Sequence, residues 1–161
     1  MRHQFSIDLP VRNEWANVDL LRTSILNCFT AVFNDVDGCR SMAMVVGELL
    51  ENAIKYGAWS GDERGFRLKV VGEENLARIT VENPIEPTDP TIADLMATLA
   101  WLQKFSSADE AYRARLLEVA ATPRELGSSK LGLARISYEG SCRLSAEVDG
   151  KMVRVTAEMA Y

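Results

Sequence analysis

The chain has 161 residues, of which 47% are hydrophobic and 25% are charged, and its formal net charge is −5. This length is enough for one domain with its own apolar core, and the composition is typical of a folded protein rather than a disordered one. Nucleic-acid-binding proteins usually carry a basic surplus that neutralises phosphates, so the acidic balance argues against that class. We therefore expect a single domain over residues 1–161 that binds no nucleic acid.

Neither the cysteines nor the N-terminus indicates a special environment. Cys28, Cys39 and Cys142 lack metal-ligand spacing and are expected to pack as small hydrophobic side chains. An odd number of cysteines without a CxxC pair is consistent with a reducing compartment. The first residues are polar, and no stretch approaches the roughly 20 apolar residues that a membrane span needs. The expectation is a cytoplasmic protein with no membrane segment.

The spacing of apolar residues predicts alternating groups of strands and helices. In chain order these are a strand over 5–10, helices over about 14–33 and 39–56, strands over 66–70 and 77–81, helices over about 91–105 and 109–121, a short helix over about 131–138, and strands over 142–148 and 153–159. Pro10 is expected to end the first strand. Gly57 is placed to end the second helix by taking a left-handed conformation, and Ser106 or Ser107 is a candidate N-cap.

This order of elements predicts the fold class. Hairpin strands with helices grouped between them favour an α+β two-layer sandwich, in which helices cover one face of a mixed, mostly antiparallel sheet. A doubly wound parallel fold would need strands that alternate singly with helices, and it matches less well. The two helices between about 84 and 130 form an insert within this sandwich.

The second helix carries a polar stripe beside its buried apolar stripe. The polar side chains, which lie three or four residues apart, are Glu48, Glu51, Asn52 and Lys55. A carboxylate one turn from a carboxamide suits nucleotide chemistry, since the amide oxygen can bind Mg²⁺ and the carboxylate can accept a proton. The alternative is a solvated helix face with a Glu51–Lys55 ion pair.

This segment resembles the N box of the GHKL ATPases, the Bergerat-fold superfamily that includes histidine kinases and bacterial anti-sigma serine kinases. The resemblance implies that Glu48 is the general base and that Asn52 holds Mg²⁺. It also implies that Lys55 and Tyr56 lie near the phosphates or close the pocket.

The resemblance continues downstream. The segment 131–136, Leu-Gly-Leu-Ala-Arg-Ile, is similar to the second glycine-rich box, which opens a helix whose N-terminal amides receive phosphate. The insert at about 84–130 falls in the position of the ATP lid. Within the superfamily, segments 82–85 and 127–133 look most like those of the SiaB-type regulators, whose partners are STAS-domain proteins. Dimers are common among related anti-sigma kinases, so a homodimer is possible.

Two segments of this chain differ from the glycine-rich sequences that the family carries at the same places. Most GHKL proteins carry Asp-x-Gly-x-Gly after the third strand, where the aspartate accepts from the adenine amino group, whereas this chain has Asn83-Pro84-Ile85. The Asn83 oxygen could still accept that bond, although without the help of a charge. Lys130 replaces a small residue of the second loop, and it either pairs with a phosphate or fills the space that phosphates need.

Two hypotheses from different classes follow. In the first, the chain is a Mg·ATP-dependent serine/threonine kinase that acts on a STAS-domain or sigma-factor-like partner. In the second, it is a non-catalytic GHKL-fold module that binds such a partner without nucleotide. For the first hypothesis, the predicted ATP-binding residues are Asn52, Lys55, Tyr56, Asn83, Gly127, Ser128, Ser129, Lys130, Gly132 and Leu133. Glu48 is the predicted catalytic base, and Asn52 is the predicted metal ligand.

Overall fold

A computed structural model describes residues 4–60, 65–122 and 128–160, with the side chains of 128–130 left outside the description. Within these ranges the chain forms five strands and five helices. In chain order they are β1 (Phe5–Arg12), α1 (Ala16–Val32), α2 (Val36–Tyr56), β2 (Gly65–Gly72), β3 (Leu76–Pro84), α3 (Pro90–Leu102), α4 (Ala108–Ala121), α5 (Ser128–Glu139), β4 (Cys142–Asp149) and β5 (Met152–Ala160).

The five described strands form one sheet in the order β1-β2-β3-β5-β4. Each neighbouring pair is antiparallel, so the parallel component of the expected mixed sheet does not occur among these strands. Short connections explain two of these pairs, because a hairpin joins β2 to β3 and another joins β4 to β5 through Gly150 at φ 57°. The α+β class predicted from the order of elements is confirmed.

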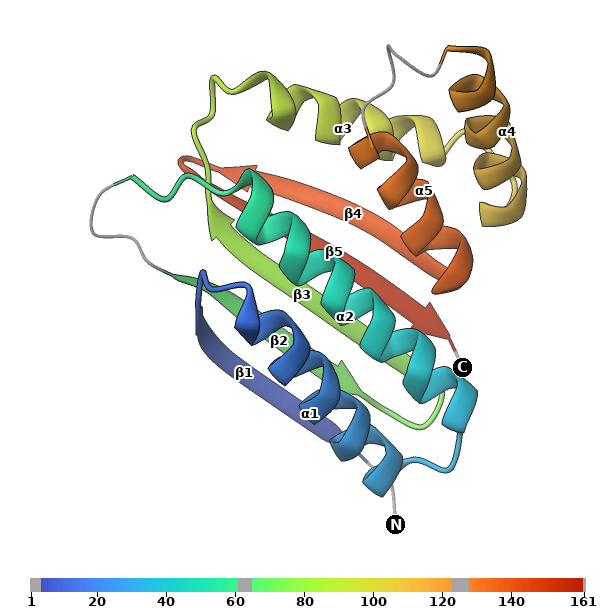
Figure 1. The fold of residues 1–161 in the computed structure, drawn as a ribbon. Helices are drawn as coiled ribbons and strands as arrows, with labels where there is room; N and C mark the ends of the chain where they lie inside the picture. The colour runs from blue at the N-terminus through green and yellow to red at the C-terminus, as the bar shows by residue number, and fades with distance from the viewer. Residues whose placement is uncertain (1–3, 61–64, 123–127, 161) are drawn as a thin grey trace.

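The helices cover one face of the sheet and enclose the core (Figure 1). Helices α1 and α2 lie side by side on that face, α5 continues the layer toward β4, and α3 and α4 lie at one end. Helix α2 supplies much of the apolar interior, with Met42, Val45, Val46 and Leu50 almost fully buried. These side chains pack against alternate strand residues such as Leu68, Val70, Ile79 and Val81. The two-layer arrangement follows from this pairing of apolar faces.

Two residues that were expected to end a strand or a helix behave differently in the structure. Strand β1 continues through Pro10 to Arg12. It lies at the edge of the sheet, where a residue without an N–H group is tolerated. Gly57 does end α2, but in an extended conformation with φ −70° and ψ 152°, so no left-handed turn requires it. Its small size matters instead, because a Cβ atom there would lie 2.4 Å from the Trp59 ring.

The predicted lid insert contains α3 and α4, each of which begins at a polar cap. The Asp89 side chain accepts from the Thr91 amide, and the Ser107 side chain accepts from the Glu110 amide. The buried Arg115 of α4 lies 3.9 Å from the ring centre of Trp101 near the end of α3. This cation–π contact ties the two helices together.

In the described part of the chain, no helix is both long and apolar enough to cross a membrane.

Candidate functional site

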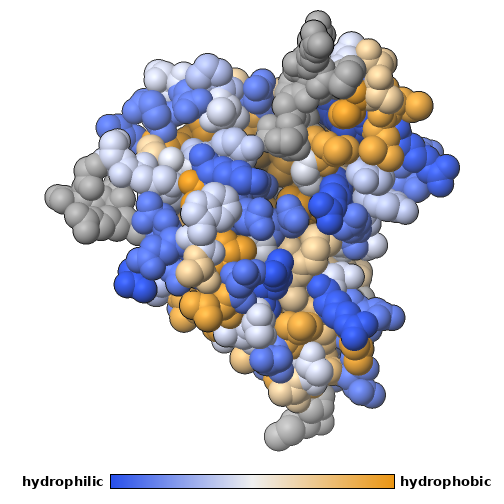
Figure 2. Space-filling view, in the orientation of Figure 1, coloured by the Kyte–Doolittle hydropathy of each residue, from blue (hydrophilic) through white to orange (hydrophobic). Residues whose placement is uncertain are grey.

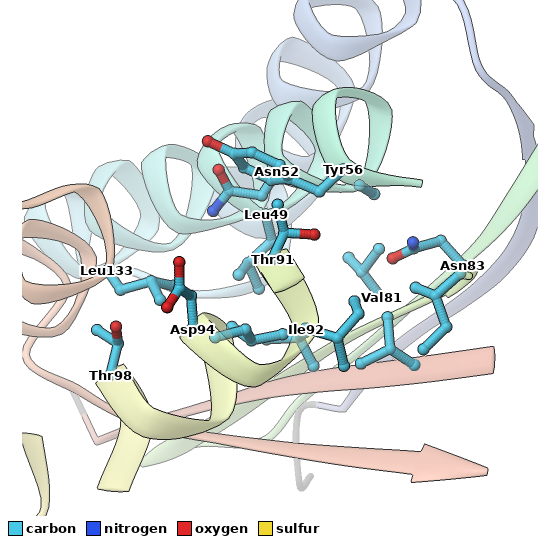
Figure 3. Close-up of a pocket in the computed structure, with 15 residues that line it drawn as sticks. Leu49, Asn52, Tyr56, Val81, Asn83, Thr91, Ile92, Asp94, Thr98 and Leu133 are labelled. Atoms are coloured by element: carbon cyan, nitrogen blue, oxygen red, sulfur yellow. The ribbon is translucent and has the colours of Figure 1, made fainter. Parts of the chain in front are cut away.

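A pocket lies between α2, α3 and the sheet, and α5 closes one side (Figure 3). Its volume is about 90 Å³, which is room for several water molecules. The lining residues are Leu49, Asn52, Ala53, Tyr56, Val81, Asn83, Ile85, Thr91, Ile92, Asp94, Leu95, Thr98, Leu133, Val153 and Val155. Most of these side chains are apolar, and a few polar groups reach in among them. That composition is typical of small-molecule sites.

Helix α2 brings Asn52 and Tyr56 to the same side of this pocket. They stand one turn apart, and Figure 3 shows the Tyr56 ring lying along α2 beside the Asn52 side chain. Leu49 and Ala53, on the same helix, are buried and form part of the apolar wall. The Asn52 carboxamide thus stands beside this apolar wall at the pocket, and its predicted role as a Mg²⁺ ligand stays a prediction.

Asn83 lies at the end of β3 and is almost fully buried, with 4% of its surface exposed. Its amide nitrogen donates to the Pro84 carbonyl at 3.1 Å. This bond orients the carboxamide and leaves its oxygen as an acceptor at the pocket, where Figure 3 shows it beside Val81. The arrangement suits a flat ligand that presents a hydrogen-bond donor at its edge.

Helix α3 contributes polar groups that the sequence did not single out. Thr91, Asp94 and Thr98 line the pocket opposite α2 (Figure 3). They recur every three or four residues, so they share one helix face with the apolar Ile92 and Leu95 nearby. Nearby, hydrogen bonds from the Thr91 amide and hydroxyl hold the pKa of Asp89 below its ordinary value. The spacing of Thr91, Asp94 and Thr98 was the available signal.

Glu48 lies one turn before Asn52 on α2, half-buried, and is not one of the pocket-lining residues. Its charge acts on Arg135 of α5, whose pKa is raised first by the hydrogen bond to Glu139 and further by Glu48. Glu48 therefore stands outside the pocket, on the side of α2 near α5. A base in this position can act on a group that approaches from outside rather than on one inside the pocket.

Lys55 is not brought to the pocket. Its Nζ lies 3.8 Å from the Glu51 carboxylate and 5.9 Å from the ring centre of Trp15. The Glu51–Lys55 pair matches the solvated-face alternative for these two residues.

The second glycine-rich segment takes a different shape from the one expected. Helix α5 begins at Ser128, three residues earlier than predicted, so Ser128, Ser129 and Lys130 belong to a helix rather than a loop. Gly127 lies outside the described residues, as do the side chains of the three residues after it. Gly132 stands within the helix, and Leu133 lines the pocket. The part of α5 around Leu133 thus lies at the pocket.

The side chains available as metal ligands limit what kind of metal site the described residues could form. Among the described residues, no three His, Cys, Asp or Glu side chains gather to hold a metal ion. Mg²⁺ takes octahedral oxygen ligands and commonly uses one or two protein groups together with phosphates and water. The Asn52 oxygen fits a Mg²⁺ site of this kind, in which the protein supplies one ligand and a nucleotide would supply others.

Comparison with known proteins adds evidence on the fold. No protein-family model matches the sequence, and no curated protein matches it. Among solved structures, the chain is similar to one described as the crystal structure of the SiaB-SiaC complex from Pseudomonas aeruginosa. The TM-score is 0.67 at 14% sequence identity, and the match covers 96% of this chain and 89% of the other. The chain therefore shares its fold, over nearly its whole length, with a component of a two-protein complex.

Proposed function

We propose that this chain is a partner-switching regulator of GHKL type, which binds Mg·ATP and phosphorylates a serine or threonine of a STAS-domain partner. The convergence of Asn52 and Asn83 carries the proposal. They come from a helix and a strand that are distant in sequence, and both line one apolar pocket. The fold shared with a component of the SiaB-SiaC complex supports a role in binding another protein.

Each part of the pocket has a role in this proposal. The apolar walls receive the adenine ring, and the Asn83 oxygen accepts from its amino group. Asn52 holds Mg²⁺, which neutralises charge on the phosphates when bound. The N-terminal half of α5, from which Leu133 reaches the pocket, receives the phosphates. Glu48, outside the pocket, accepts the proton of the partner's hydroxyl.

The pocket is smaller than a nucleotide site usually is, so this proposal requires that it widen on binding. Ligand pockets usually measure roughly 300–1,000 Å³, whereas this one measures about 90 Å³. Helix α3 forms the wall opposite α2 and connects to the body of the fold by loops, so it is the element that has to move outward. Nucleotide binding is therefore coupled to displacement of α3 in this proposal.

A calorimetric titration with Mg·ATP tests the nucleotide site. We expect saturable binding by the wild type and binding about tenfold weaker or worse for Asn52→Ala and Asn83→Ala, because each loses a polar contact in a partly desolvated site. Asn27→Ala is the matched control, since Asn27 is exposed on α1 and should leave the affinity unchanged. No heat from the wild type at millimolar ATP would reject the proposal.

Phosphotransfer to a STAS-domain protein encoded near this gene tests the base. Glu48→Gln should lower the transfer rate by roughly 10²–10⁴-fold, because the amide cannot take the hydroxyl proton. Its Mg·ATP affinity should stay the same, since Glu48 does not line the pocket. Glu51→Gln is the control, because Glu51 lies on the same helix and pairs with Lys55. Equal rates for the wild type and Glu48→Gln would remove Glu48 from the mechanism.

The second candidate is a binding module without catalysis. The position of Lys55 favours it, since that lysine pairs with Glu51 rather than facing the pocket. This candidate predicts that the STAS-domain protein binds equally well with and without Mg·ATP, and that no phosphate is transferred.

A further inference from the structure

Charged and aromatic side chains gather where α4 packs on α5. We call this group the α4–α5 surface: Tyr112 from α4, and Arg135, Tyr138 and Glu139 from α5. The rings of Tyr112 and Tyr138 are stacked, with centres 4.8 Å apart and planes 9° apart. The Nε of Arg135 donates to the Glu139 carboxylate at 3.0 Å. Both contacts hold their side chains in defined positions.

This surface adjoins the proposed base. Helix α5 packs on α2, and directly after its end a Cβ atom at Gly140 would lie 2.5 Å from a methyl carbon of Val45. The hydrogen bond to Glu139 raises the pKa of Arg135 above its ordinary value, and the charges of Glu139 and Glu48 act in the same direction. Glu48 follows Val45 by one turn of α2, so it lies on the side of α2 that faces α5, and its charge reaches Arg135.

The exposure and composition of the surface are those of a binding site for protein. The side chain of Arg135 is 49% exposed and Tyr138 is 40% exposed. Tyrosine and arginine are enriched among the residues that dominate binding energy at protein interfaces. The stacked rings are already ordered, which lowers the entropy lost on binding. Neither Tyr112 nor any of the α5 members lines the pocket.

On the face of the molecule that Figure 2 shows, no large apolar patch stands out as an alternative docking site. Figure 2 shows hydrophobic side chains on the helical face in several separate clusters, with hydrophilic side chains between them. The α4–α5 surface is distinguished instead by its ordered aromatic pair, its guanidinium and its position next to Glu48.

We propose that the α4–α5 surface is the docking site for the partner protein that is to be phosphorylated. The inference rests on the proposed function, because Glu48 can act only on a hydroxyl within about 3 Å. The segment carrying that hydroxyl must then contact the side chains around Glu48. Arg135 uses Nε for Glu139, so its terminal nitrogens can donate to a carbonyl or carboxylate of the partner. The partner is a protein whose acceptor serine or threonine is flanked by such oxygens.

The test measures binding of any STAS-domain protein encoded near this gene, in purified form, with Mg·ATP affinity measured separately. Arg135→Met and Tyr138→Ala should each weaken partner binding by about tenfold, as loss of an interface anchor does. Tyr138→Phe should bind nearly as well as the wild type because it keeps the stack. Arg143→Met is the matched control, an exposed arginine on β4. All four variants should keep the wild-type affinity for Mg·ATP.

The outcomes separate this inference from the proposed function. Wild-type partner affinity in both Arg135→Met and Tyr138→Ala would overturn the docking site, even if phosphotransfer occurs. Absence of partner binding by the wild type would overturn it as well. If the wild type binds the partner and the two variants do not, the docking site stands, whether or not ATP is bound. Thermal unfolding of Tyr138→Ala checks that α4 and α5 still pack, and Arg135→Met gives an answer that does not depend on the stack.

Discussion

At the scale of single residues, two glycines have opposite effects on the stability of the helices that carry or precede them. Gly57 ends α2 where a Cβ atom would lie 2.4 Å from Trp59 and 2.7 Å from the Ala53 carbonyl oxygen. Gly132 stands inside α5, and apart from its chain neighbours and the nearby helix backbone no described atom lies within 4 Å of its Cβ position. The first glycine is needed for space. The second one weakens its helix, because glycine is a poor helix former.

Alanine at these two positions should therefore change stability in opposite directions. We expect Gly57→Ala to lower the free energy of unfolding by about 1–3 kcal/mol, because Trp59 packs on Phe66 and donates to the Ile54 carbonyl. Gly132→Ala should raise it by up to about 1 kcal/mol. Denaturant unfolding of both variants at one pH gives the two values. A stability loss in Gly132→Ala as large as that in Gly57→Ala would contradict this reading of α5.

At the scale of elements, the sequence predicts those whose pattern is long and periodic. Helix α2 and the two hairpins follow from apolar spacing, and Ser107 caps α4 as its sequence position suggested. The misses have local physical causes. Pro10 was expected to stop β1, but an edge strand tolerates it. The Gly-Ser segment before Leu131 was expected to be a loop, but Ser128 already begins α5.

The candidate site was predictable to the extent that it lies on one helix. Spacing placed Glu48 and Asn52 one turn apart, and spacing also offered the Glu51–Lys55 pair that the structure contains. The partnership of Asn52 with Asn83 came from the family resemblance, because no local pattern relates a helix to a distant strand end. Thr91 and its neighbours on α3 become pocket residues only through the packing of α3 against the sheet.

At the scale of the whole molecule, buried thiols couple the core to pH. Burial raises the pKa of the Cys142 thiol to about 12, from 9.0. Its thiol donates to the Ile136 carbonyl at 3.4 Å, which holds β4 against α5. Burial also raises the pKa of Cys39, on α2. Both thiols keep their protons in the folded protein at pH values where the unfolded chain loses them.

This difference predicts an alkaline loss of stability. Below pH 9 both states hold the Cys142 proton, so the contribution of Cys142 to stability is complete and constant. Between pH 9 and about 12 the unfolded state binds fewer protons, so the free energy of unfolding falls as pH rises, by up to about 1.4 kcal/mol per pH unit. Small folds usually unfold cooperatively, so this local effect becomes a property of the whole fold.

Denaturant unfolding of the wild type and Cys142→Ala from pH 7 to 10.5 measures the effect. The variant should be less stable at pH 7, because the smaller side chain leaves unfilled space in the core. Its stability should then fall less steeply above pH 9, so that the two curves approach each other by roughly 2 kcal/mol at the highest pH. The slope, rather than the level, carries the information, because the two proteins differ only at position 142. Parallel curves over the whole range would mean that the Cys142 thiol ionises as readily in the folded state as in the unfolded chain.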